Sequence, residues 1–143
     1  MFTVKRLPTS SNLDDAAKIR TEVFCKEQGF DITQEFDGND DAAWHIMLYD
    51  GDLPVATGRI LCNGEDTYTL GRIAVLVGYR GNQTGRFLVE NLIGYAKDLG
   101  AKHIKVGAQT RVVGFYEKLG FSVCGEEYMD EHVPHIPMIQ QVR

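Results

Sequence analysis

The chain has 143 residues, of which 43% are hydrophobic and 24% are charged, and its formal net charge is −5. This length is enough to bury an apolar core without disulfides or a structural metal. The acidic balance argues against a broad basic face for nucleic acid, so any anion site must be local. The three cysteines are widely spaced and odd in number. They argue against a disulfide framework or a zinc site and predict a reducing, cytoplasmic setting.

The sequence gives no sign of membrane insertion or of a second domain. No segment approaches the roughly 18 consecutive apolar residues that span a bilayer, and the N-terminal residues lack the apolar region of a signal peptide. Internal repeats and linkers are also missing from the sequence. We therefore expect one cytoplasmic domain over residues 1–143, without a membrane partner.

The first half of the chain combines one helix with several strands. Asn12 is placed to cap a helix over residues 13–28, in which apolar residues recur at helical spacing, and Gly29 is a natural stop. The acidic stretch 31–41 is typical of a solvated loop, and a substrate-facing loop is the less common alternative. Strands are predicted over residues 44–49, 53–62 and 67–77.

The second half predicts a strand-helix-strand unit followed by shorter elements. Residues 73–77 form a near-continuous apolar run, which is typical of a central strand buried on both faces. A helix over about 84–99 follows, and further elements are predicted as a strand over 102–107, a helix over 112–119 and strands over 121–127 and 136–142. The order β-α-β-β-β-α-β-α-β-β makes residues 67–107 a parallel unit. We expect one mixed α/β sheet with helices on both faces.

The loop between the apolar strand and this helix reads Tyr79-Arg80-Gly81-Asn82-Gln83-Thr84-Gly85-Arg86. Its glycine spacing fits neither a P-loop nor the dinucleotide fingerprint. It nevertheless leaves the carboxyl end of a buried strand, which is where α/β sheets bind ligands. The N-terminus of the helix, together with Arg80 and Arg86, would suit a pyrophosphate. The alternative is a plain turn with a helix cap.

Two segments resemble signatures of the GNAT N-acetyltransferases. Residues 74–85 resemble the acetyl-CoA signature of that family, an apolar strand followed by Arg/Gln-x-x-Gly-x-Gly/Ala, and residues 114–121 (GFYEKLGF) resemble its "FYEKLGF" segment. The resemblance extends to the bacterial ElaA and YjcF subgroup, and it covers nearly the whole chain. It implies a GNAT fold with a twisted, mostly antiparallel sheet of about seven strands around the parallel core. It also implies acetyl-CoA as co-substrate and no metal.

The resemblance assigns the cofactor residues. The backbone of residues 73–75 would pair with the pantetheine amides, as an added strand would. The implied set is Ile73, Ala74, Val75, Arg80, Gly81, Asn82, Gln83, Thr84, Gly85, Arg86, Phe115, Tyr116 and Lys118. Gln83 departs from the family, which usually has its middle glycine there. This departure leaves open whether the side chain intrudes on the cofactor.

The implied reaction is direct attack of a primary amine on the thioester, with Tyr116 as candidate general acid. The amine must first lose a proton, and the candidate bases are Glu27, Glu35, Asp37, His45 and His135. Many relatives place a carboxylate three residues before Val75, where this chain has Arg72. Arg72 is therefore hypothesised to bind a negative group on the acceptor. The residues that we assign to the acceptor are Glu27, Arg72, Gln109 and His135.

Several alternatives stay open. The departures at Gln83 and Arg72 leave room for a non-catalytic domain that binds acyl-CoA as a sensor or regulator. A nucleotide-binding domain is the weaker alternative, because both glycine spacings fail. Apart from the resemblance, Tyr116 is typical of a core tyrosine and His45 of a structural histidine. We expect a small-molecule or peptide amine as acceptor, and the apolar C-terminal hairpin around Ile136 would offer an edge for a homodimer.

Overall fold

One eight-stranded sheet organises the protein in this computed structural model, which describes residues 2–81 and 83–142. The strands are β1 (Thr3–Leu7), β2 (Trp44–Asp50), β3 (Leu53–Cys62), β4 (Thr67–Val75), β5 (His103–Gln109), β6 (Ser122–Val123), β7 (Tyr128–Asp130) and β8 (Val133–Gln141). Their order is β1-β2-β3-β4-β5-β8-β6, with β7 paired to β8. The β4–β5 pair is parallel and the other pairs are antiparallel, which confirms the predicted mixed fold with a parallel core.

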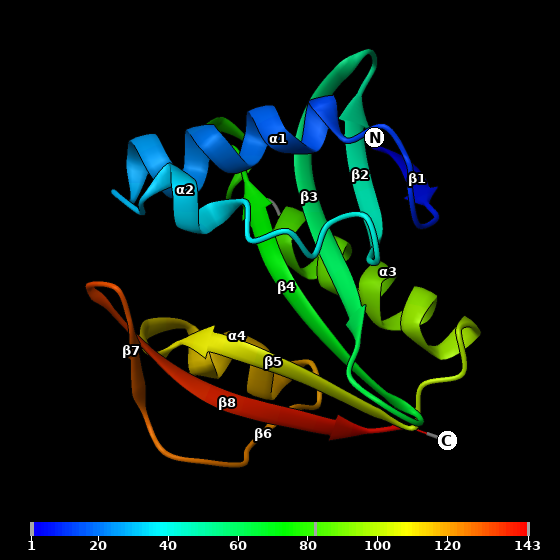
Figure 1. Ribbon diagram of the computed structural model, residues 1–143, viewed down its shortest axis with the longest axis vertical. Coiled ribbons are helices and arrows are strands. Elements are labelled where there is room, and N and C mark those ends of the chain that lie inside the picture. Colours follow the sequence, from blue (N-terminus) through cyan, green and yellow to red (C-terminus); the bar gives the residue numbers. More distant parts are fainter. Residues whose placement is uncertain (1, 82, 143) are drawn as a thin grey trace.

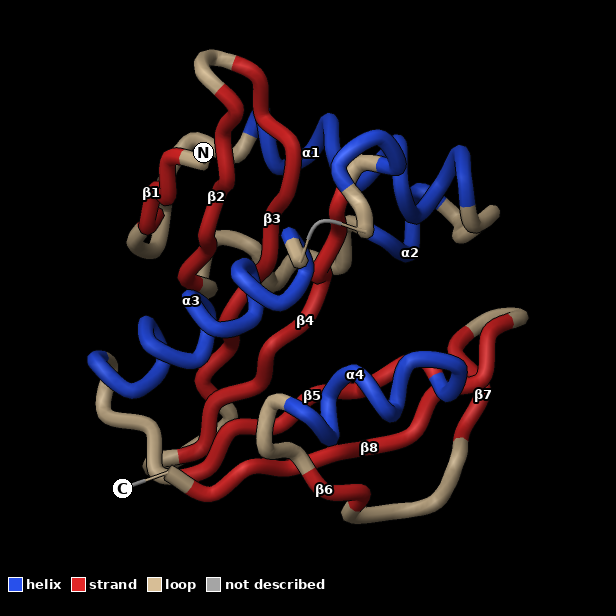
Figure 2. Tube along the Cα trace, turned by 180° about the vertical axis from the view of Figure 1, so that it is seen from behind, coloured by secondary structure: helices blue, strands red, loops and turns tan. Residues whose placement is uncertain are grey.

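Helices cover both faces of the sheet. They are α1 (Asp14–Arg20), its π-helical continuation η1 (Thr21–Glu27), α2 (Ile32–Glu35), η2 (Val77–Tyr79), α3 (Thr84–Asp98), η3 (Thr110–Val112) and α4 (Val113–Lys118). α1 lies on one face, and α3 and α4 lie on the other (Figure 1, Figure 2). Leu88 and Leu92 of α3 belong to the larger apolar core, and Ile19 of α1 belongs to a smaller one. None of the described helices has the length and apolar content that crossing a bilayer requires.

The first predicted helix is present, but it changes type midway. Asn12 Oδ1 accepts a hydrogen bond from the Asp14 N–H at 2.9 Å, so this side chain acts just before the first turn. α1 then passes into the π-helix η1, and Gly29 follows with a φ of 75°, a conformation that glycine adopts freely. π-helical segments are rare and occur often at functional sites. Sequence spacing gave no signal for this change.

A bulge in β4 opens the sheet. Arg59 of β3 lies opposite Gly71, and Thr57 lies opposite Ala74, so β4 carries one extra residue between these pairs. Arg72 sits in this bulge with a φ of 48°. β4 and β5 pair only over Thr67–Leu70 and His103–Val106, and beyond that point the two strands diverge (Figure 1). The diverging halves form the two walls of a wedge-shaped cleft.

The structure corrects several predicted elements. β4 ends at Val75 rather than 77, and it is not buried on both faces, because the cleft opens beside its second half. The strand predicted over 121–127 shortens to the two residues of β6, and the β7–β8 hairpin was missed. β8 lies between β5 and β6, and Met138 on it is fully buried. β6 and β7 thus cover parts of the outer edge of β8, and the homodimer through the C-terminal strands stays a prediction.

Candidate functional site

The wedge between β4 and β5 contains a cavity of about 1120 Å³. Its walls include the cofactor residues that the sequence predicted, except for Asn82, which lies outside the described residues. Residues predicted for the acceptor also line it, namely Arg72, Gln109 and His135. Glu27 does not line the cavity, but it contacts Arg80, which does. One cleft thus gathers side chains from both halves of the chain.

The N-terminus of α3 forms one end of the cleft. Gln83 precedes the helix in a left-handed conformation with a φ of 61°, and its side chain makes no capping hydrogen bond. The first N–H groups of α3 therefore face outward without an intrahelical acceptor, which is a geometry that suits an anion. The Thr84 hydroxyl next to them is buried and has no hydrogen-bond partner among the described residues. Arg86 and Lys118 add exposed positive charge at this end.

Gly85 allows an aromatic ring to approach the start of α3. A Cβ atom on Gly85 would lie 3.6 Å from Phe115 Cζ, so the ring of Phe115 packs against the first turn of the helix. Phe115 in turn meets Tyr116 edge-on, with ring centroids 5.0 Å apart. These contacts join the Arg-Gly loop to the FYEKLGF segment, which lies about thirty residues further along the chain. The two sequence signatures are thus parts of one wall.

Tyr116 lies on this wall as an almost fully buried phenol. Its residue is 7% exposed, and its ring also packs edge-on against Phe121. Burial raises the pKa of Tyr116 well above its ordinary value. The phenol is therefore protonated at neutral pH and able to donate a proton or a hydrogen bond into the cleft. Its burial also fits the core role that its sequence pattern suggested.

A second group of polar side chains forms the opposite wall. His135 of β8 lies between Gln109 of β5 and Tyr128 of β7 in the sheet register. Its Nδ1 lies 2.9 Å from the Val133 carbonyl, which accepts a hydrogen bond, so Nδ1 carries the proton and Nε2 is left as the basic nitrogen. The ring stacks on Tyr128 at 5.7 Å between centroids.

Gln109 connects this wall to the end of the first helix. Its Nε2 donates to Gln28 Oε1 at 3.0 Å across the cleft, and its Oε1 accepts from Arg111 Nε at 3.0 Å and Nη2 at 2.7 Å. The Tyr128 hydroxyl covers β5 from the other side, where it would collide with a Cβ atom on Gly107. Sequence reasoning missed Gln28, Arg111 and Tyr128, because only the folded η1, η3 and β7–β8 hairpin bring them to the cleft.

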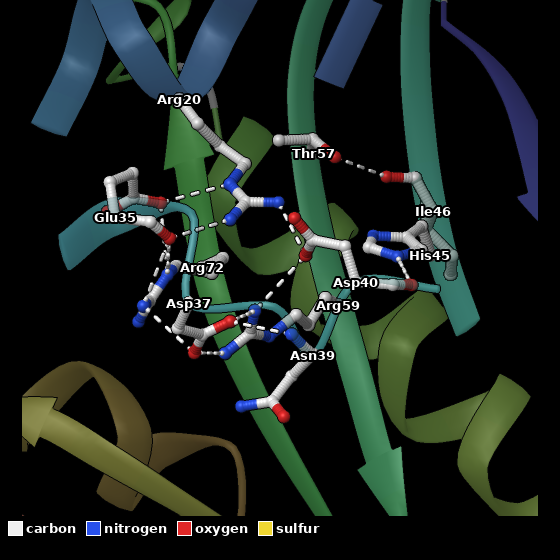
Figure 3. Close-up of polar contacts among 10 residues, drawn as sticks. All are labelled: Arg20, Glu35, Asp37, Asn39, Asp40, His45, Ile46, Thr57, Arg59 and Arg72. Carbon is white, nitrogen blue, oxygen red and sulfur yellow. Dashed lines mark hydrogen bonds and ion pairs between the residues drawn. The ribbon is translucent and has the colours of Figure 1, made fainter. Parts of the chain in front are cut away.

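A cluster of charged side chains, in which Arg20, Glu35 and Arg59 are buried, lies beside the bulge of β4 (Figure 3). It consists of three arginines and three carboxylates, namely Arg20, Arg59, Arg72, Glu35, Asp37 and Asp40. Arg20 donates to Glu35 at 2.9 Å and to Asp40 at 2.8 Å, and its residue is only 1% exposed. The opposite charges are equal in number, so the cluster adds no net charge to the cleft.

Arg59 and Arg72 complete the cluster from the sheet. Arg59 holds Asp37 with two hydrogen bonds of 3.0 and 2.8 Å and reaches Asp40 at 3.1 Å. Arg72 lies 3.0 Å from Glu35 and 3.3 Å from Asp37. These contacts hold residues 31–41 against the bulge of β4. The prediction of a solvated loop is wrong for Glu35, which is buried. Asp37 is exposed and Asp40 half-buried, and both pair with arginines that lie far away in the sequence.

The cluster decides among the candidate bases. Hydrogen bonds from Arg59 hold the pKa of Asp37 well below its usual range. Burial raises the pKa of Glu35, while Arg72 and Arg20 oppose that rise. Guanidinium groups engage both carboxylates, but only Asp37 is a weak proton acceptor, because burial makes Glu35 easier to protonate. His45 is buried, its Nε2 lies 3.1 Å from the Asp40 carbonyl, and burial lowers its pKa, so it is structural as predicted.

Arg72 lines the cavity, and its predicted role toward the acceptor stays a prediction. We hypothesised that it binds a negative group on the acceptor, but Glu35 and Asp37 already occupy its guanidinium. This arginine of β4 thus binds two carboxylates from the segment 31–41. In the described parts of the chain, no cluster of three His, Cys, Asp or Glu side chains is arranged to hold a metal ion.

The fold and the cleft place an open strand edge, a free helix N-terminus and positive side chains between two diverging parallel strands, an arrangement that suits an extended, anionic ligand. Comparison with known families makes this specific, since residues 12–142 match the acetyltransferase (GNAT) domain. The chain belongs to the GNAT acetyltransferase family. This confirms the resemblance that the two sequence signatures indicated.

Individual relatives agree with this assignment. The Bacillus subtilis N-acetyltransferase YjcF is 38% identical over 130 residues, which cover 90% of this chain and 91% of YjcF. The Escherichia coli protein ElaA is 31% identical over 137 residues, 92% of this chain and 89% of its own. The crystal structure of ElaA superposes with a TM-score of 0.89 over 99% of this chain and 100% of that one, at 29% identity. An acyl-CoA N-acyltransferase from Pseudomonas aeruginosa gives 0.88 at 26% identity, over 98% and 99% of the two chains.

Proposed function

We propose that the protein transfers an acetyl group from acetyl-CoA to a primary amine, which attacks the thioester carbonyl directly. The observation that carries this proposal is that one cleft contains an exposed helix N-terminus, an open strand edge and a buried tyrosine. The α3 N-terminus with Arg86 and Lys118 suits the pyrophosphate. The free edge of β4 beyond Leu70 suits the pantetheine amides, which bind there as an added strand.

Tyr116 is the general acid in this proposal. Its phenol is kept protonated by burial, and it lies on the wall where the thioester sulfur would end. Donating that proton to the leaving thiolate completes the transfer, while the amine nitrogen forms the new bond to the acyl carbon and the carbon–sulfur bond breaks. The nitrogen loses its extra proton to water as the amide forms, and the tyrosine regains a proton from solvent after product release.

His135 is the base that the geometry favours. Its Nδ1 donates to the Val133 carbonyl, so Nε2 is the nitrogen that can accept a proton, and its ring lies in the cleft beside Gln109. It can take the proton that the ammonium form of the acceptor must lose, directly or through water. Glu35 and Asp37 are less suitable, because both are held by arginines.

The test is acceptor-dependent release of CoA thiol, measured over a panel of small amines and amino-terminal peptides. We expect release with at least one acceptor and a kcat about 100-fold lower in Tyr116→Phe, with CoA affinity unchanged. The His135→Gln variant should lose the acidic limb of the kcat/KM profile. A His135→Gln profile that matches the wild type would remove this residue as the base.

A non-catalytic acyl-CoA sensor is the second candidate. It is favoured by one observation, since the strand position where many relatives carry a carboxylate holds Arg72, which is bound to Glu35 and Asp37. A sensor would bind acetyl-CoA in calorimetry and release no thiol across the whole panel. Turnover with any amine at a rate that depends on Tyr116 would exclude it.

A further inference from the structure

One arginine bridges the cofactor cleft near the start of α3. Arg80 donates from Nη1 to Glu27 Oε2 at 2.7 Å and from Nη2 to Glu27 Oε1 at 2.8 Å, a bidentate pair. Its Nε donates to the Val75 carbonyl at 2.9 Å. One guanidinium therefore joins the last residue of η1, the last residue of β4 and the loop that precedes α3.

These three contacts use groups that the proposed co-substrate needs. Val75 ends β4 at its open edge, and its carbonyl is an acceptor that an added strand of pantetheine would pair with. Arg80 lies in the loop that would hold the pyrophosphate. Glu27 places a carboxylate beside that loop, where it repels a phosphate. The bridge and the co-substrate thus compete for the same atoms.

We propose that the Glu27–Arg80 pair is a latch that closes the cofactor groove in the free protein and opens when CoA binds. On binding, Arg80 exchanges the Glu27 carboxylate for a phosphate oxygen and releases the Val75 carbonyl. Glu27 is then a positioning residue that lowers the affinity for CoA, rather than a ligand of it. This inference rests on the proposed function, because it takes CoA as the occupant of the cleft.

The Glu27–Arg80 ion pair has favourable geometry, yet its exposure allows it to separate when a ligand binds. A bidentate guanidinium–carboxylate pair has the best geometry available to two side chains. Both side chains are more than a third exposed, at 38% and 39%, so water takes over their hydrogen bonds when they separate. A second ion pair of η1, Glu22 with Lys26 at 3.6 Å, has neither residue among those that line the cleft and offers a matched control.

The test is calorimetric titration of CoA into the wild type, Glu27→Gln and Glu22→Gln. We expect Glu27→Gln to bind CoA about five- to tenfold more tightly, because the latch is lost while the length of the side chain is kept. Glu22→Gln removes the same charge from the same helix and should stay within about twofold of the wild type. Equal or weaker binding by Glu27→Gln would overturn the latch.

The same titration with Arg80→Gln separates a latch from general electrostatics. In the Arg80→Gln variant, Glu27 has no arginine to bind at this position. Adding Glu27→Gln should therefore raise the CoA affinity by less than about twofold. An undiminished gain in the Arg80→Gln background would show that Glu27 acts only by repelling phosphate, and would overturn the latch. A wild-type protein that does not bind CoA would refute the proposed function, whereas CoA binding without the Glu27 effect refutes the latch alone.

Discussion

At the scale of single residues, Gln83 shows how a departure from a family pattern is accommodated. Its φ of 61° is in the left-handed region, which explains why glycine is common at this position. The side chain is exposed and makes no capping hydrogen bond, so the helix N-terminus behind it is free. The backbone therefore provides the geometry and the glutamine side chain adds strain without closing the site.

Gln83→Gly is expected to leave CoA affinity within about twofold of the wild type, because no contact of the side chain is lost. Gln83→Val places a β-branched residue in the left-handed region and should lower the free energy of unfolding by about 1 kcal/mol. Calorimetry and urea denaturation measure the two effects. A loss of CoA affinity above tenfold in Gln83→Gly would show that the glutamine side chain itself binds the ligand.

At the scale of elements, the buried charge cluster explains why the acidic segment 31–41 is ordered. Asp37 accepts from Arg59 and Arg72 and also from the Asn39 N–H at 3.1 Å. Each of these groups comes from a different element, and together they hold the loop over the bulge of β4. A sequence shows that such a stretch is acidic, but pairing with distant arginines follows only from the sheet register.

Asp37 should make stability depend on pH in the acid range. Arg59 holds its folded pKa below the unfolded value of about 3.9, so its contribution is full above that pH and is lost as pH falls below it. Asp37→Asn should lower the free energy of unfolding by about 2 kcal/mol at pH 7. Below pH 4 its free energy of unfolding should fall less steeply with decreasing pH than that of the wild type. Urea denaturation from pH 3 to 7 measures both.

Asp41→Asn is the control for this prediction, since the exposed Asp41 makes no ion pair with the described residues. It should match the wild type within about 0.5 kcal/mol at every pH. Equal pH profiles for Asp37→Asn and the wild type would mean that the loop is held without this carboxylate.

Most of the fold and one wall of the site were predictable from sequence. Period-two and helical patterns located β2, β3 and α3 to within about a residue, because their apolar faces are buried against one another. The Arg-Gly loop and Tyr116 were found through local signatures. The bulge at Arg72, the Glu27–Arg80 bridge and the wall formed by Tyr128 were not, because each depends on contacts between segments that are distant in sequence.

At the scale of the whole molecule, the cleft exists because β4 and β5 diverge while two apolar cores hold the remaining strands together. α1 packs against one face and α3 against the other, and both fix β4 through Ala74 and Leu70. β5 is held instead by β8 and α4 (Figure 2). In the described parts of the chain, the two halves of the sheet pair as strands only over Thr67–Leu70 and His103–Val106.

Hydrogen exchange should report this division directly. In the free protein, amides of residues 71–75 have a neighbouring strand on one side only, whereas those of 67–70 lie between β3 and β5. Saturating acetyl-CoA should slow exchange in 71–75 and in the first turn of α3, and should change 67–70 little. Mass-spectrometric exchange with and without the ligand measures this.

ATP at the same concentration is the matched ligand for that experiment. It shares adenine and phosphates with acetyl-CoA but has no pantetheine arm to pair with β4. It should therefore protect the start of α3 at most, and leave 71–75 as in the free protein. Protection of 71–75 by ATP, or none by acetyl-CoA, would contradict strand addition at the open edge. Protection of residues 71–75 by ATP would also favour the nucleotide-binding alternative.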